Sequence, residues 1–282
     1  VEEVMKAIEV FLRGSDNILL VVVGPYGFGK SDLLDDIEER LRGLNVEVVR
    51  AALSLSMNIK DYLIGRFKNR DLSKPMIIMF DEADELTRAV SMSGGVSSEV
   101  KNSIMQVTGL IRAILEPRNY ASLLNLKPSD LSKVMVIAAF TPQLYYSILK
   151  NNVPDVFDIA RGRVFKEVNI DDRVPYWLYE AIIENRLLSY STPERLKAIK
   201  SGELNPLHPF NRESLSLIYL IARRMENGQA SPRNLIKLAS KLFEMIAENN
   251  GQLTADLMVR FLTSEAGKYI NRTLYKSCAA DE

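Results

Sequence analysis

Residues 17–31 read NILLVVVGPYGFGKS, an apolar run followed by a glycine-rich turn that ends in Lys30 and Ser31. An apolar run of this length predicts a strand that is buried on both faces of a sheet. The turn matches G-x-x-x-x-G-K-[ST], and the apolar spacing over about 30–42 predicts that a helix follows it. Strand, turn and helix in this order indicate a phosphate-binding loop, because glycines let successive backbone N–H groups point at phosphate oxygens.

The expected ligand of this loop is a nucleotide, ATP or ADP. The start of the helix adds a partial positive charge, Lys30 would reach the β- and γ-phosphates, and the Ser31 hydroxyl would bind Mg²⁺. The alternative is a glycine-rich turn that binds nothing, but a lysine at a helix start is unfavourable unless an anion accompanies it. The residues expected to contact the nucleotide here are Gly24, Pro25, Tyr26, Gly27, Phe28, Gly29, Lys30, Ser31 and Asp32.

A second polar site follows the apolar run MIIMF at 76–80, where Asp81 and Glu82 come next. Both carboxylates should lie at the carboxyl edge of the sheet, beside the phosphate loop. Asp81 would hold Mg²⁺ through water, and Glu82 would orient and deprotonate the attacking water. The alternative is two solvated acids at a strand end. The Asp/Glu pair favours hydrolysis over transfer to a small acceptor.

The rest of the chain divides into two parts near residue 172. Strands alternate with helices up to that point, which predicts an α/β fold with a parallel five-stranded sheet flanked by helices. Beyond it the sequence predicts helices alone, so we expect a core at 1–172, a helical region at 173–265 and a tail at 266–282. The remaining predicted strands are 46–51, 134–140 and 164–170, the helices 58–68, 100–115, 175–190, 193–200, 212–226, 232–248 and 255–263, and the loops 91–98 and 117–133.

Composition excludes several chemistries. The 282 residues include 36 Lys+Arg, 36 Asp+Glu, one His and one Cys. A single histidine and a single cysteine allow neither a His-rich metal site nor an intrachain disulfide, and His208 is expected in a surface loop. The cysteine usage favours a reducing, cytoplasmic setting. Zero net charge argues against a polybasic nucleic-acid coat, and apolar runs far shorter than about 20 residues argue against a membrane span.

Over about residues 1–265 the chain resembles AAA+ ATPases. Gly24–Ser31 is similar to the Walker A motif, and Met76–Glu82 is similar to the Walker B motif. The resemblance implies a five-stranded core followed by a helical lid, ATP hydrolysis with Mg²⁺, and either self-association or a partner ATPase subunit.

The order of motifs in that family implies further site residues. Thr141, after the fourth strand, corresponds to sensor 1, which orients water or the γ-phosphate. Arg233, which follows a Ser-Pro helix start, corresponds to sensor 2. Arg161 and Arg163 are both candidates for the arginine finger, which acts on the nucleotide of a neighbouring subunit. The alternatives are a strand-end threonine, a surface arginine and a structural arginine pair.

Within the family the chain resembles initiator and origin-recognition ATPases of archaeal type. The string DEADEL at 81–86, the Pro-Arg start of the sensor 2 helix and the amphipathic helix at 1–13 carry this resemblance. The departures are the large side chains of Tyr26 and Phe28 in the loop and the roughly 20 residues after the last predicted lid helix, which are too few for a winged-helix domain. Either a further domain lies outside this sequence, or the chain is a relative of the initiators with another role. The string DEAD at 81–84 also invites comparison with helicases, but these need a second nucleotide-binding lobe, and no strand is predicted after residue 172, so a helicase is not expected.

These features leave two functional hypotheses. The first is an ATP-hydrolysing switch in DNA transactions, such as replication initiation or DNA remodelling, with duplex DNA as a possible partner. Residues 117–133 could then place Arg118, Lys127 and Lys133 against phosphates in a hairpin, although a solvated loop is the default. The second is a nucleotide-gated signalling, defence or recombinase-loading ATPase that acts through protein partners. No membrane partner is expected.

Overall fold

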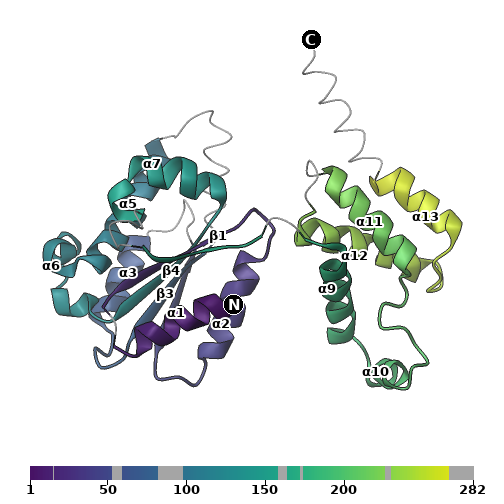
Figure 1. Cartoon of the computed structure of the whole chain (residues 1–282), viewed down its shortest axis with the longest axis horizontal. Helices are drawn as coiled ribbons and strands as arrows, with labels where there is room; N and C mark the ends of the chain where they lie inside the picture. The colour runs from purple at the N-terminus through teal and green to yellow at the C-terminus, as the bar shows by residue number, and fades with distance from the viewer. Residues whose placement is uncertain are drawn as a thin grey trace, which may run out of the picture. The chain divides into compact units, whose positions relative to one another are not determined.

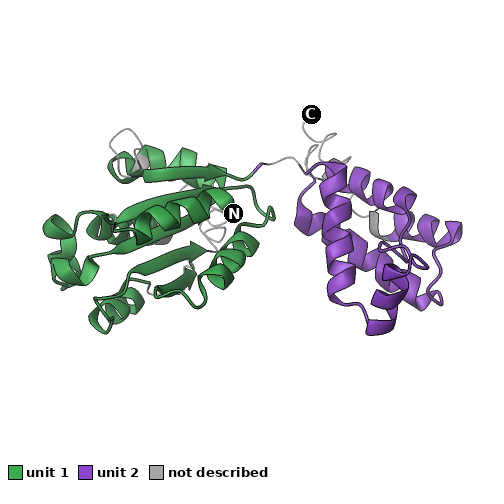
Figure 2. Ribbon diagram, turned by 60° about the horizontal axis from the view of Figure 1, so that its bottom comes forward, with its two compact units in different colours: residues 1–170 green, residues 171–282 purple. Residues whose placement is uncertain are grey.

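The computed structural model describes residues 1–14, 16–52, 59–81, 98–157, 164–171, 174–225 and 230–266. The chain forms two compact units, Val1–Ile170 and Asp171–Glu282 (Figure 2). The predicted loop at 91–98, except Ser98, and the tail from residue 267 onward lie outside the described residues. Among the described helices, none has the length and apolar character needed to cross a membrane.

The first unit is built on a five-stranded sheet whose strands are all parallel and follow the order β2-β3-β4-β1-β5. Every residue of β1, β3 and β4 is buried, as their continuous apolar sequences require. The edge strands β2 and β5 carry half-buried and polar residues instead. The predicted α/β fold with a parallel five-stranded sheet is therefore confirmed. The strands are β1 (Ile18–Val23), β2 (Glu47–Ala52), β3 (Met76–Asp81), β4 (Val134–Phe140) and β5 (Val164–Asn169).

Helices cover both faces of this sheet (Figure 1). One face packs against α1 (Glu2–Leu12) and α2 (Lys30–Leu41), through residues such as Ile8 and Leu34. The other face packs against α3 (Ile59–Lys68), α5 (Ser98–Leu115) and the segments after α5. The sheet is thus buried between two apolar clusters, and the loops of the site follow the carboxyl ends of its strands.

Residues 117–133 differ from the prediction of a solvated loop, and they contain no hairpin. They form the short helix α6 (Pro117–Tyr120) and two 3₁₀ turns, η1 (Ala121–Leu124) and η2 (Pro128–Leu131). Leu124 and Leu131 are buried in the core, and Arg70 donates hydrogen bonds to the backbone oxygens of Asp130 and Ser132. The apolar residues of 117–133 are spaced irregularly between Pro, Asn and Ser, so the sequence has no periodic pattern from which this packing could be predicted. The basic residues of this segment, Arg118, Lys127 and Lys133, are exposed. Lys133 directly precedes β4 and so lies at the edge of the sheet opposite the phosphate loop.

The segment after β4 is also helical, which the sequence analysis missed. The π-helix η3 (Gln143–Leu149) continues into α7 (Lys150–Asn152), and α8 (Pro154–Phe157) follows. Its buried residues Leu144, Tyr145, Ile148 and Leu149 show helical spacing in the sequence.

Within 174–225 and 230–266 the second unit consists of helices without a strand, as predicted. Helix α12 buries Leu235, Leu238 and Leu242 along one face, while its start is capped by Ser231, whose hydroxyl accepts from the Asn234 N–H at 3.3 Å. His208 lies in an exposed turn, as predicted. The helices are α9 (Tyr176–Ser189), α10 (Pro193–Lys200), α11 (Arg212–Met225), α12 (Pro232–Glu248), α13 (Ala255–Phe261) and η5 (Leu262–Ala266).

Candidate nucleotide-binding site

Three polar segments meet at the carboxyl edge of the sheet. The strands β1 and β4 end side by side, since Val23 pairs with Phe140, and the N–H of Gly24 donates to the Phe140 oxygen at 3.1 Å. Strand β3 runs on the other side of β4 and ends at Asp81. The phosphate loop, Asp81 and Thr141 thus lie at one edge of the sheet. Their strand-end positions predicted this for the loop and Asp81, and the family resemblance singled out Thr141.

The backbone of the loop requires glycine for two different reasons, which Gly29 and Gly24 illustrate. Gly29 is the N-cap of α2 and has φ +79°, a left-handed conformation that side chains oppose. Gly24 is in an ordinary conformation, but a Cβ there would lie 2.9 Å from the Cβ of Ile170. The N–H of Ile170 also donates to the Val23 oxygen at 2.7 Å. The curl of the loop therefore depends on close packing against the end of β5.

Lys30 begins α2 and is only 6% exposed. Its Nζ donates to the backbone oxygens of Gly24 and Pro25, each at 3.0 Å. The ammonium group is thereby held across the loop, where it can exchange carbonyl partners for phosphate oxygens. Of the two large loop residues, Phe28 is buried and Tyr26 is 43% exposed, so neither side chain prevents the backbone from curling.

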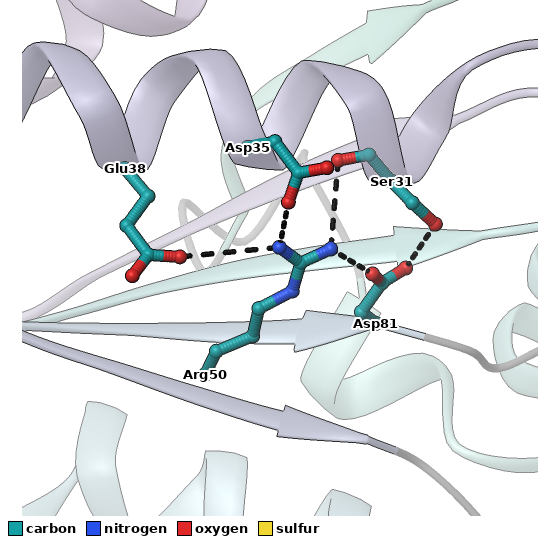
Figure 3. A network of polar contacts seen from close by, with 5 residues as sticks. All are labelled: Ser31, Asp35, Glu38, Arg50 and Asp81. Carbon is teal, nitrogen blue, oxygen red and sulfur yellow. Dashed lines mark hydrogen bonds and ion pairs between the residues drawn. The ribbon is translucent and has the colours of Figure 1, made fainter.

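A hydroxyl and a carboxylate stand together beside the start of α2. The Ser31 Oγ donates to Asp81 Oδ1 at 3.0 Å, and Asp81 is 4% exposed (Figure 3). Mg²⁺ prefers hard oxygen ligands and binds through one or two protein groups together with substrate phosphates. Ser31 and Asp81 fit that requirement and are the residues that would hold the ion. Asp32 is exposed in the first turn of α2.

Arg50 of β2 is a site residue that the sequence analysis missed. It donates hydrogen bonds to Asp81 of β3 and Asp35 of α2, and its Nη1 lies 3.9 Å from a Glu38 oxygen (Figure 3). Burial opposes the charge of Arg50, but its hydrogen bonds to Asp81 and Asp35 and their negative charges outweigh this effect, so its pKa is raised. The only sequence signal was a charged residue inside an apolar strand. The contact between Arg50 and Asp81 depends on strand order, because the pairing of Arg50 with Met79 puts Arg50 on the same face of the sheet as Asp81.

Thr141 lies directly after β4 and is 6% exposed. Its hydroxyl accepts from the Leu144 N–H at 3.3 Å, and its backbone oxygen accepts from the Tyr145 N–H at 3.0 Å. The side chain thus fixes the start of η3 at the same edge of the sheet as the phosphate loop. Glu82, Arg161 and Arg163 lie outside the described residues.

Arg233 belongs to the second unit, where it is exposed in the first turn of α12. Ser231 caps this helix, and Pro232 occupies its first position. A cation in the first helical turn opposes the helix dipole, so the local structure favours an anion near this residue.

Comparison with known proteins bears on the first unit. Residues 20–159 match the sequence model of the ATPase family associated with various cellular activities (AAA). The matched range contains the phosphate loop, Arg50, Asp81 and Thr141. No curated protein matches the chain. The family match and the sheet geometry together support an AAA+ ATPase whose core binds a nucleotide.

Proposed function

We propose that this protein is an ATP-hydrolysing AAA+ switch that acts in DNA transactions, in the manner of replication initiators or DNA-remodelling ATPases. The observation that carries the ATPase proposal is the pairing of Ser31 with Asp81 beside the buried Lys30. The DNA proposal rests on the resemblance to initiators, carried by the helix before β1, the DEADEL string at 81–86 and the Pro-Arg start of α12.

The core residues divide the work of phosphoryl transfer. Backbone N–H groups of the loop and the start of α2 receive the phosphates, and Lys30 neutralises their charge. Ser31 and Asp81 hold the site for Mg²⁺, which when bound offsets negative charge on the phosphate oxygens. Glu82 orients the attacking water and takes its proton, and Thr141 helps to orient that water.

Two arginine sites complete the proposed cycle. Arg233 responds to the γ-phosphate and couples nucleotide state to the helical lid, for which we propose residues 173–265. Arg161 or Arg163 acts on the nucleotide of a neighbouring copy or a partner ATPase subunit, where it stabilises charge on the transferring phosphoryl group. The active species is then an oligomer, and hydrolysis changes how its subunits hold one another or DNA.

The test is ATP turnover by the purified chain with Mg²⁺, measured with and without duplex DNA, together with the mass of the protein in solution under the same conditions. We expect turnover that rises when DNA and self-association are present. Glu82→Gln should still bind ATP but lose turnover by about a hundredfold or more, as loss of a catalytic base does. Glu39→Gln, an exposed acid on α2, is the matched control.

Each alternative has a distinct outcome. Normal turnover in Glu82→Gln would remove the role of that residue. Tight ADP retention without turnover would favour a nucleotide-gated module that acts through protein partners. Turnover that is indifferent to DNA would leave the ATPase proposal intact and reject the DNA proposal.

A further inference from the structure

Arg50 connects three elements around the expected metal position. Its guanidinium group lies between strand β3, through Asp81, and helix α2, through Asp35 and Glu38 (Figure 3). The side chain is 29% exposed, while Asp35 is 62% exposed and Glu38 is 40% exposed. Arg50 therefore has one buried anionic partner and two solvated ones.

Both oxygens of the Asp81 carboxylate are engaged. Oδ1 accepts from the Ser31 hydroxyl at 3.0 Å, and Oδ2 accepts from Arg50. A carboxylate this buried needs a nearby positive charge, because burial of an uncompensated charge is costly. Arg50 supplies that charge from β2, and the carboxylate is held in a fixed orientation next to Ser31.

The charge balance of the cluster leaves room for a divalent cation. The carboxylates of Asp35, Glu38 and Asp81 against the one guanidinium group of Arg50 give a formal charge of −2. Mg²⁺ at Ser31 and Asp81 would neutralise it, but it would share the Asp81 carboxylate with Arg50. Two cations on one carboxylate repel each other, and the repulsion is strong where water is scarce.

We propose that Arg50 competes with Mg²⁺ for the Asp81 carboxylate. Arg50 holds Asp81 in place in the absence of the metal, and it sets the Mg²⁺ concentration at which nucleotide binds. Asp35 and Glu38 give the guanidinium group an alternative anionic partner on α2 when the metal takes up Asp81. Arg50 is thus a positioning residue that acts through Asp81. This inference rests on the proposed nucleotide site and adds a regulator to it.

The test titrates Mg²⁺ against the binding of a fluorescent ADP analogue, so the readout is binding rather than turnover. Arg50→Gln removes the competing charge, and we expect the half-saturating Mg²⁺ concentration to fall by about fivefold or more. Arg50→Lys keeps the charge and should stay closer to the wild type. Arg66→Gln is the matched control. Arg66 of α3 forms an ion pair at 2.8 Å with Glu47 of β2, the strand that carries Arg50, but this pair lies away from the phosphate loop.

A second variant should shift the requirement in the opposite direction. Asp35→Asn removes one of the two solvated partners of Arg50, so the guanidinium group should bind Asp81 more firmly. The half-saturating Mg²⁺ concentration should then rise by about threefold or more. Asp35 is well exposed, so this variant tests the proposal even if Arg50→Gln does not fold.

The outcomes separate this inference from the proposed function. If the wild type does not bind the ADP analogue at any Mg²⁺ concentration, the proposed function fails. If the wild type binds but the Mg²⁺ requirement is unchanged or higher in Arg50→Gln, or unchanged or lower in Asp35→Asn, Arg50 is only a brace between β2, β3 and α2 and the inference is overturned.

Discussion

The two units bury polar side chains for different purposes. In the described part of the first unit the buried polar residues are Lys30, Asp81 and Thr141 at the carboxyl edge of the sheet, together with Thr108, whose hydroxyl donates within α5 to the Ile104 oxygen at 2.8 Å. In the described part of the second unit they are Ser214 and Ser231. Ser231 is the N-cap of α12, and Ser214 forms a capping box with Asn211 at the start of α11.

The difference shows where the molecule accepts an energetic cost. A buried ammonium and a buried carboxylate are expensive unless they are paired, and the first unit keeps both within reach of one loop. The buried hydroxyls of the second unit satisfy the free N–H groups of helix starts, which stabilises the helices. Substitutions at Lys30 or Asp81 should therefore change ligand binding, whereas substitutions at Ser214 or Ser231 should change stability.

Lys30→Ala should have the largest effect and tests this comparison most directly. We expect nucleotide affinity to fall by at least about a hundredfold, since hydrogen bonds to charged groups contribute about 1.5–3 kcal/mol each. Titration with a fluorescent nucleotide measures the change. Lys200→Ala, an exposed lysine in the last turn of α10, is the control in the second unit. Unchanged affinity in Lys30→Ala would break the comparison.

Thr141→Ala sharpens the comparison, because Thr141 has features of both classes. Its hydroxyl accepts from a backbone N–H, as the caps do, but it lies at the proposed catalytic edge. We expect turnover to fall about tenfold, as for loss of one positioning hydrogen bond in the transition state. Thr141→Ser should recover most of it. A loss of stability without a loss of turnover would place Thr141 with the caps of the second unit.

Ser214→Ala tests the other side of the comparison. Loss of the Ser214 hydroxyl removes the half of the capping box that accepts from the Asn211 N–H, which should lower the free energy of unfolding of the second unit by about 1 kcal/mol. Denaturant unfolding measures this change, and nucleotide affinity should stay at the wild-type value. Weaker nucleotide binding with unchanged stability would contradict the structural role of this buried serine.

Glu167→Gln should have the smallest effect, a loss of unfolding free energy that depends on pH. Burial tends to raise the pKa of Glu167, but hydrogen bonds from Tyr146, Lys150 and Asn169 lower it more, and the net pKa lies below its usual value. A lowered folded-state pKa stabilises the fold above the unfolded-state pKa, and this contribution is lost as pH falls through the folded-state pKa.

The wild type should therefore exceed Glu167→Gln in unfolding free energy by up to about 1 kcal/mol at neutral pH. The difference should shrink below about pH 4.3, the ordinary pKa of glutamate. Denaturant unfolding at several pH values measures it. A difference that stays constant through acid pH would exclude a contribution from the charge of Glu167.

Much of the first unit could be predicted from local patterns. The phosphate loop, the strand positions and the edge shared with Asp81 follow from apolar runs that end in glycines or carboxylates. Arg50 could not be predicted, because its contact with Asp81 requires β2 and β3 to be neighbours, and strand order is a property of the whole sheet. The packing of 117–133 was hidden for a similar reason, since its buried residues contact distant parts of the chain without any local period.

Ile170 has a mechanical consequence. It is the last residue of the first unit, and its N–H donates a hydrogen bond to the Val23 oxygen. Its side chain leaves no room for a Cβ on Gly24. The peptide that leads into the second unit thus starts from a side chain wedged against the first residue of the phosphate loop. A single residue, Ile170, therefore separates the backbone of Asp171 from the phosphate loop.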